Sequence, residues 1–149
     1  MRSWLFNMQL AKRVKEQTWN NLINGDLVNL TGTNSFFVCQ EVDDELKLRL
    51  KEQDIMPAGL LWGSYEQTKF EDVYQSIRHK LNDYKKWLDE LENRGLVMMT
   101  RSLVCLTTDL IYKIEEQDLI LSFSLPKGSY ATMFIRELVH TDIPHKHKS

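Results

Sequence analysis

The feature of this 149-residue chain that most constrains its fold is a strand, a tight turn and a helix close to its C-terminal end. Across residues 119–125, apolar side chains alternate with more polar ones, which predicts a β-strand with one apolar face. Pro126 and Gly128 end the strand, and Ser129 is placed to cap a following helix through its hydroxyl. Apolar residues then recur at helical spacing as far as Leu138.

Two interpretations of this turn are open. The free N–H groups of a helix start, with Gly128 allowing a ligand to come close, can bind a phosphate or another anion, and the ring of Tyr130 can stack on a base. Alternatively, the turn does no more than connect a strand to a helix. The types of residue at these spacings fit both interpretations.

The identities of the residues are more specific than their spacing. The run LPKGSYATMFIREL at 125–138 closely resembles the C-terminal signature of the tRNA pseudouridine synthase D (TruD) family, LPxG-[SA]-[FY]-ATxxxREL, with Lys127 where alanine is usual. Four further stretches resemble motifs of the same family and follow its order. They are RSWLFN at 2–7, GDLVNLTGTNSFF at 25–37, GLLWG at 59–63 and GLVMMTRSL at 95–103. The resemblance therefore runs from one end of the chain to the other.

The resemblance implies the isomerisation of a uridine in tRNA to pseudouridine, in which the base is detached, turned and rejoined through carbon. This reaction needs an extruded base and an Asp carboxylate, but no metal or organic cofactor. Family members are longer chains, and their segment with the catalytic Asp and the neighbouring NxFGxQRFG stretch has no counterpart among these residues. We therefore expect a C-terminal fragment that contains no catalytic residue and is inactive alone.

The resemblance also implies which residues of this chain form the wall of the active site or contact RNA. These are Gly128, Ser129, Tyr130, Ala131, Thr132, Arg136 and Glu137. Tyr130 is expected near the target uridine, with Arg136 and Glu137 supporting the cleft. Arg136 equally suits a structural ion pair, so both roles stay open. No metal site is expected.

The predicted fold class is α+β. By the resemblance, residues 1–100 are part of the family's insertion domain, which is helical and β, and residues 101–149 are a C-terminal piece of the pseudouridine synthase catalytic domain. That piece is expected to be a partial antiparallel or mixed β-sheet with one C-terminal helix. Strands that pair with absent neighbours leave open edges and an uncovered apolar face.

Hydrophobic periodicity predicts the other elements. The long helical pattern near the middle of the chain favours packing within its own domain over a coiled coil, and Asp26, after Gly25, is expected to hydrogen-bond local backbone. The predicted elements are a helix from Ser3 to about Gln17, a hairpin of Leu27–Leu30 with Phe36–Val38, a helix capped by Asp43, a loop at 55–64 that carries Trp62, and a helix from about Glu66 to Arg94 with a break near Asn82.

Composition limits the function less than the motifs do. The net charge of −2 gives no sign of a nucleic-acid binder, so any RNA contact requires a local concentration of positive charge. Cys39 and Cys105 lie in apolar, strand-like contexts and are predicted to be buried free thiols. Because no apolar run approaches the length of a membrane span, we expect a cytoplasmic protein without a membrane partner.

Three interpretations of function follow from the sequence. The first is a fragment of a tRNA pseudouridine synthase D whose partner is tRNA. The second is a non-catalytic RNA-binding module that uses the insertion domain alone. The third is a half-enzyme whose unpaired β surface completes a partner chain in trans, such as a separately encoded N-terminal half.

Overall fold

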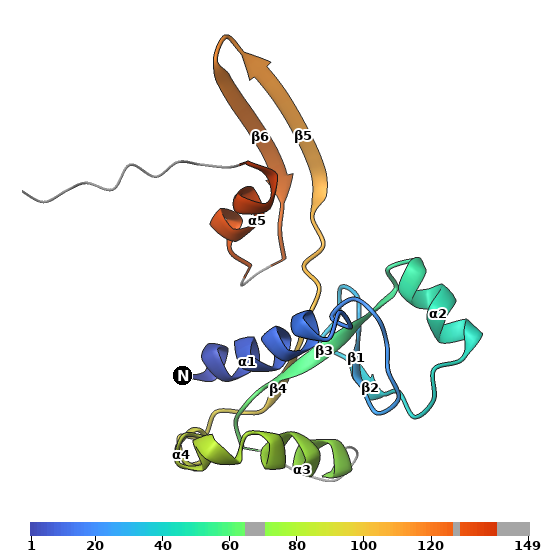
Figure 1. Cartoon of the computed structure of the whole chain (residues 1–149), viewed down its shortest axis with the longest axis vertical. Coiled ribbons are helices and arrows are strands. Elements are labelled where there is room, and N and C mark those ends of the chain that lie inside the picture. Colours follow the sequence, from blue (N-terminus) through green and yellow to red (C-terminus); the bar gives the residue numbers. More distant parts are fainter. Residues whose placement is uncertain (65–70, 127–128, 140–149) are drawn as a thin grey trace, which may run out of the picture. The chain divides into compact units, whose positions relative to one another are not determined.

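The computed structural model describes residues 1–64, 71–126 and 129–139 and confirms the α+β class. The chain divides into two compact units, Met1–Val104 (unit 1) and Cys105–Ser149 (unit 2). Figure 1 labels the elements. In chain order they are α1 (Arg2–Lys15), β1 (Leu27–Leu30), β2 (Phe36–Val38), α2 (Asp44–Lys51), β3 (Ile55–Leu61), α3 (Glu71–Lys80), the 3-10 helix η1 (Asn82–Tyr84), α4 (Lys85–Asn93), β4 (Met99–Ser102), β5 (Thr108–Glu115), β6 (Asp118–Ser124) and α5 (Ala131–Leu138).

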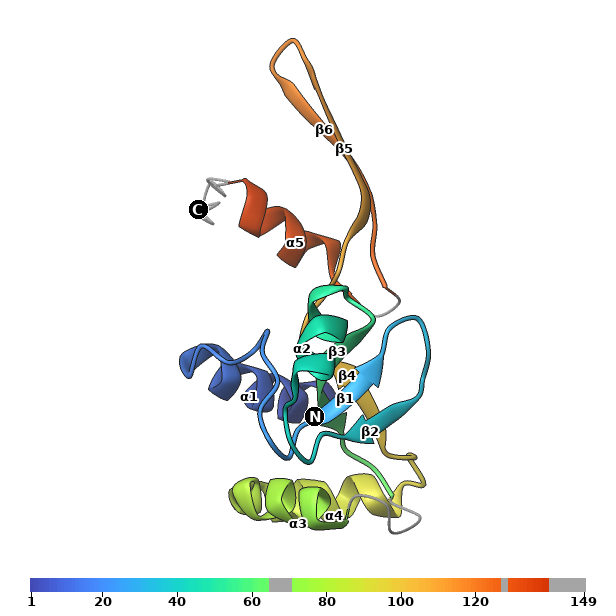
Figure 2. The same ribbon diagram turned by 90° about the vertical axis from the view of Figure 1, so that its right-hand side faces the viewer.

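Unit 1 is built on a four-stranded antiparallel sheet in the order β2-β1-β3-β4. The predicted hairpin of β1 with β2 is confirmed, with Val28 opposite Phe37. Strand β3 lies between β1 and β4, and its Ala58 pairs with Leu27 on one side and with Ser102 on the other. Helices α3 and α4 run below this sheet in both views of the molecule (Figures 1 and 2).

The prediction of a loop at 55–64 is wrong, because β3 is a central strand of the sheet. Pro57 has no N–H to donate, but its carbonyl accepts a hydrogen bond from the N–H of Leu103 at 2.8 Å. Leu103 lies just past the last residue of β4, so the donor that Pro57 lacks falls at the end of the ladder between β3 and β4. Gly59 is not part of a turn. It is needed for packing, because a Cβ atom there would lie 3.1 Å from the ring of Phe6 in α1. A glycine at this point lets the helix lie directly against the strand.

The two faces of the sheet bury two separate apolar cores. Leu27, Leu60 and Trp62 join a core that also holds Leu5 and side chains of the α3–α4 region. Val28 and Ile55, which alternate with these along the strands, join a second core against α2. Helix α2 begins as predicted, with the carboxylate of Asp43 accepting a hydrogen bond from the N–H of Leu46 at 2.8 Å.

The predicted break in the long helical segment is confirmed. Residues 65–70 are outside the described part of the chain, and from Glu71 onward the segment consists of α3, η1 and α4. The N–H of Leu81 is shared between the carbonyls of Ile77 and Arg78, which tightens the chain into the 3-10 turn. Gly95, with φ of +69°, follows the end of α4, and it allows a left-handed conformation that other residues rarely adopt.

Unit 2 consists of a β-hairpin and one helix in its described residues. Strands β5 and β6 pair with each other, with Tyr112 opposite Leu121, and form a two-stranded sheet. The rings of Phe123 and Phe134 meet edge to face, with centroids 4.7 Å apart, and this contact joins β6 to α5. Exposure of the hairpin is high on both faces, since Ile111 is 65% exposed and Tyr112 is 71% exposed. The expected open edges and uncovered apolar surface are therefore present.

The two cysteines differ in environment. Cys39 is buried as predicted, with 1% of its surface exposed, whereas Cys105 is exposed, so the prediction for Cys105 is wrong. The apolar pattern around Cys105 suggested a covered strand, but the residue precedes an uncovered hairpin and donates a hydrogen bond to the hydroxyl of Ser129 at 3.2 Å. Burial, together with the negative charges of Asp26 and Asp43, raises the pKa of the Cys39 thiol.

Thiol labelling at pH 8 tests this difference. We expect one cysteine per chain to react rapidly with a disulfide reagent, because thiolate is the reactive form and Cys39 is both inaccessible and held protonated. Cys105→Ser should remove the rapid phase, while Cys39→Ser should leave it unchanged. A rapid phase that survives in Cys105→Ser would contradict the described burial of Cys39.

Gly63 should be intolerant of any side chain. A Cβ atom there would lie 2.1 Å from the carbonyl oxygen of Leu96, where Ser64 and Val97 form a parallel bridge. Because the obstacle is backbone, we expect Gly63→Ala to lower the free energy of unfolding by more than about 2 kcal/mol in urea titrations. Gly32→Asn is the control: Gly32 has open space around it and a left-handed backbone that Asn tolerates, so a change below about 0.5 kcal/mol is expected.

Candidate functional site

The strand and the helix predicted at 119–138 are present as β6 and α5, but the helix starts later than expected. Gly128 lies outside the described residues. The predicted N-cap role of Ser129 is wrong: the N-cap residue is Tyr130, and no side chain caps the helix. The N–H of Ser129 instead donates to the carbonyl of Pro126 at 3.1 Å, and the extended backbone of Tyr130 directly precedes α5.

The described residues of this motif share one exposed stretch of chain. Tyr130 is 71% exposed, and Ala131, Thr132, Arg136 and Glu137 follow it as exposed positions on α5. The guanidinium of Arg136 donates a hydrogen bond to the sulfur of Met133 at 3.8 Å, and among the described residues no carboxylate pairs with it. The arrangement provides an aromatic ring and a cation that solvent can reach, which suits stacking and anion contact rather than acid–base chemistry.

A cleft of about 590 Å³ lies within unit 1 and was not predicted from the sequence. Its walls come from α1, from the segment 23–27, and from α3, with β-strand residues such as Ala58 and Gly59 also lining it. The lining combines apolar residues, among them Met8 and Ile77, with charged side chains. Because these elements are far apart in the sequence, no local pattern could have indicated the cleft.

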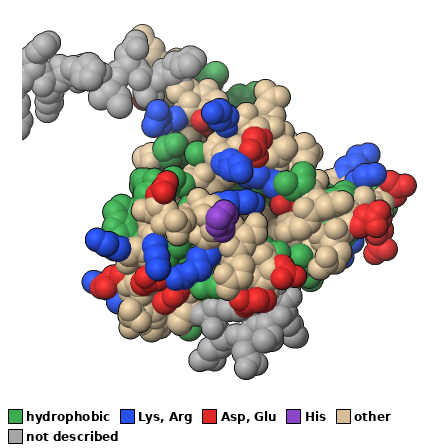
Figure 3. Space-filling model, turned by 60° about the horizontal axis from the view of Figure 1, so that its bottom comes forward, with side chains coloured by type: hydrophobic (Ala, Val, Ile, Leu, Met, Phe, Trp, Pro, Cys, Tyr) green, Lys and Arg blue, Asp and Glu red, His purple; other side chains and the backbone are tan. Residues whose placement is uncertain are grey.

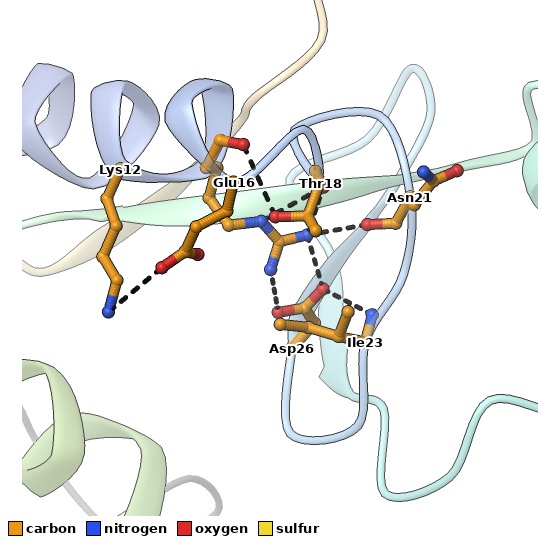
Figure 4. Close-up of polar contacts among 7 residues, drawn as sticks. Lys12, Glu16, Thr18, Asn21, Ile23 and Asp26 are labelled. Atoms are coloured by element: carbon orange, nitrogen blue, oxygen red, sulfur yellow. Dashed lines mark hydrogen bonds and ion pairs between the residues drawn. The ribbon is translucent and has the colours of Figure 1, made fainter.

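A bidentate ion pair between Arg13 and Asp26 lies at the cleft (Figure 4). The guanidinium donates to both carboxylate oxygens, at 2.7 and 3.0 Å, and the two side chains are only 12% and 13% exposed. It also donates to the carbonyls of Thr18 and Asn21, at 2.7 Å each. The N–H of Ile23 donates to Asp26 at 2.9 Å, which confirms the expected bond to local backbone.

Charges in and around the cleft are largely balanced. Arg13 is neutralised by Asp26, and Lys12 lies 3.7 Å from Glu16. Figure 3 shows one face of the molecule, on which acidic and basic side chains are interspersed. Among the residues that the structure describes, no group of His, Cys, Asp and Glu could hold a metal ion. The cleft is therefore suited to binding or packing, and its lining includes no arrangement for nucleophilic catalysis.

A second polar cluster joins β3 to the helices. The carboxylate of Glu92 accepts hydrogen bonds from the indole N–H of Trp62 at 2.9 Å and from the hydroxyl of Tyr74 at 3.0 Å, and it pairs with Arg78. Burial, and then the bond to Glu92, raises the pKa of Tyr74. Asp89 binds the second nitrogen of Arg78 at 2.5 Å. These printed contacts tie β3 to α3 and α4, so the cluster has a structural role.

Sequence similarity to known proteins extends over most of the chain. The family model described as tRNA pseudouridine synthase D (TruD) matches residues 1–138. A tRNA pseudouridine synthase D from Legionella pneumophila (strain Corby) is 39% identical over 139 residues, which are 93% of this chain and 41% of that protein. The corresponding protein from Hydrogenovibrio crunogenus is 36% identical, over 92% of this chain and 40% of its own. The chain thus spans about two fifths of the length of these relatives.

The fold resembles that of a solved structure. The crystal structure of the tRNA pseudouridine synthase D (TruD) candidate from Methanosarcina mazei matches with a TM-score of 0.59 and 20% identity. The match covers 91% of this chain and 36% of that one. At this identity the likeness concerns the fold. In the described part of the chain, no helix has the length and hydropathy needed to cross a bilayer.

Replacing Asp26 should destabilise unit 1. Asp26→Asn leaves the guanidinium of Arg13 largely buried without a counter-charge, so we expect the free energy of unfolding to fall by about 2–4 kcal/mol in urea titrations. Asp54→Asn is the matched control, because it removes the carboxylate from the pair with Arg49, in which Asp54 is 53% exposed. That change should cost less than about 1 kcal/mol. Equal losses of unfolding free energy in the two variants would show that burial does not determine how much the Arg13–Asp26 pair stabilises the fold.

Proposed function

The chain belongs to the tRNA pseudouridine synthase D family, and on that basis we propose that it forms the C-terminal part of an enzyme that isomerises a uridine in tRNA to pseudouridine. The observation that carries the proposal is the match of the family over residues 1–138 while only about two fifths of each relative is covered. The partner is tRNA, because that is the RNA in the names of the relatives.

We assign residues 1–100 to the insertion domain of this enzyme and residues 101–149 to the last piece of its catalytic domain. The chain does divide into two compact units close to this boundary, but four residues later, after Val104. Strand β4 ends at Ser102 and pairs with β3, so the sheet of unit 1 includes the last residues before the change of unit.

The chain supplies the wall of the active site and not its catalytic carboxylate. The family segment with the catalytic Asp is absent from these residues, so the isolated chain is expected to be inactive. Support for a half-enzyme comes from the exposed hairpin β5–β6: an isolated two-stranded hairpin is at best marginally stable in water, and both faces here carry large apolar side chains such as Ile111 and Tyr112. A sheet in the missing part would cover these surfaces.

Tyr130, Arg136 and Glu137 are the residues that we place on the cleft wall, together with Gly128, Ser129, Ala131 and Thr132. The exposed ring of Tyr130 suits stacking against an extruded base, and the exposed guanidinium of Arg136, which pairs with no carboxylate among the described residues, suits a phosphate. The alternative, a non-catalytic RNA-binding module, needs only unit 1 and has no role for this stretch.

A pseudouridine assay on unmodified tRNA transcript tests the proposal. The chain alone should give no product, and adding the N-terminal part of the Legionella relative should restore activity. Replacement of the catalytic Asp in that added part should abolish it. In the active mixture, Tyr130→Ala should lower the rate at least about tenfold, while Tyr130→Phe, which keeps the stacking ring, should retain most of it.

Three other results would change the proposal. Product from the chain alone would contradict the absence of the catalytic residue. If the mixture gives no product but the chain binds tRNA tightly, the RNA-binding module is favoured over the half-enzyme. If neither activity nor tRNA binding is observed, the proposed function fails.

A further inference from the structure

The arginines of unit 1 differ in how their charge is compensated. Five of them are half-buried, and burying a cation is costly unless a counter-charge is present. Three of the five pair with carboxylates: Arg13 with Asp26, Arg49 with Asp54, and Arg78 with Asp89 and Glu92. In the described residues, no carboxylate pairs with the remaining two, Arg2 and Arg101.

These two arginines lie at the same corner of unit 1. Arg101 is opposite Gly59 in the ladder between β3 and β4, and its guanidinium is 5.4 Å from the centroid of the Phe6 ring in α1. Arg2, in the first turn of α1, donates hydrogen bonds to the carbonyl of Leu61, at 3.0 Å, and to that of Val97. The first residues of α1, the end of β3 and the strand β4 therefore bring two cations together.

The electrostatics of this corner favour an anion. Burial and the positive charge of Arg101 together lower the pKa of Arg2. Carbonyls accept hydrogen bonds from Arg2 but provide no full negative charge, and its Nε atom is buried without a hydrogen-bond partner. The ring of Phe6 offers Arg101 only a weak attraction compared with that of a carboxylate. An oxyanion with several acceptor atoms would supply the full negative charge that the surroundings of these two cations lack.

We propose that Arg2 and Arg101 together bind a phosphate group of the RNA backbone. Guanidinium groups match the geometry of phosphate oxygens through paired N–H donors, and a local pair of cations supplies what a chain with net charge −2 otherwise lacks. The proposal rests on the proposed function for the identity of the RNA, and it adds a contact on unit 1, separate from the stretch around Tyr130.

The test measures tRNA binding as a function of salt. Binding of labelled, unmodified tRNA transcript is followed by fluorescence anisotropy between 50 and about 300 mM KCl, for the chain alone and with the N-terminal part of the Legionella relative. We expect Arg101→Gln to weaken binding about five- to tenfold and to reduce the slope of log K against log salt by about 0.7–0.9, as for one lost phosphate contact.

Arg94→Gln is the matched control, since it also removes one positive charge but from an exposed pair with Glu90 on α4. Its affinity should stay within about twofold of the unchanged chain. Arg2→Lys is preferred to Arg2→Gln because it retains a donor for the carbonyl of Leu61, and it should weaken binding by losing the planar fork. Urea titrations confirm that each variant is folded before binding is compared.

A second measurement separates this proposal from the proposed function. Inorganic pyrophosphate is titrated while the side-chain Nε–H signals of the arginines are followed by NMR. Saturable shifts at Arg2 and Arg101, lost in Arg101→Gln, support the site. If the unchanged chain binds tRNA and the Arg101→Gln and Arg94→Gln variants bind it with equal affinity, the RNA contact is overturned and the proposed function stands. If the unchanged chain binds no tRNA, the proposed function fails, and an absence of pyrophosphate shifts then overturns the anion site as well.

Discussion

The burial of Trp62 at the end of β3 is the interaction on which the rest of unit 1 depends. Its ring is fully buried and stacks on Tyr74 with centroids 5.0 Å apart, and Arg78 lies 5.9 Å from the centroid on its face. Its N–H donates to Glu92 of α4. One side chain thus joins the central strand to both helices below the sheet, and burying a ring of this size without its polar partner would be costly.

The two units differ in how completely they bury their apolar side chains and pair their polar groups. Unit 1 has an antiparallel sheet with an apolar core on each face, and its buried polar groups are largely paired. Unit 2, in its described residues, joins a two-stranded hairpin to one helix through Phe123 and Phe134. Such a hairpin has few apolar contacts to oppose the entropy of ordering it. This imbalance agrees with a chain that spans about two fifths of its relatives.

Local patterns predicted the elements whose stability is local. The hairpin of β1 and β2, the capping of α2 by Asp43 and the break at Asn82 depend on neighbouring residues and were correct. Strand β3 was missed because Gly59 was read as part of a loop. Its small size instead allows Phe6 of α1 to pack against the strand, and hydrophobic periodicity carries no information about such a contact. Periodicity also could not predict the cleft or the proximity of Arg2 to Arg101, since each brings together segments that are distant in sequence. The motif stretch at 125–138 indicated the family, but α5 begins after Tyr130 and without the side-chain cap that Ser129 was predicted to provide.

The exposed hairpin of unit 2 is the surface that we expect the rest of the family's chain to cover. Amide hydrogen exchange measures this directly, because it reports the opening of each backbone hydrogen bond. We expect amides of β5 and β6 to exchange rapidly in the isolated chain and to become protected at least about tenfold when the N-terminal part of a family member is added, while amides of β1 and β3 change little. Equal exchange at β5 and β6 with and without that part would show that the added chain does not cover the hairpin.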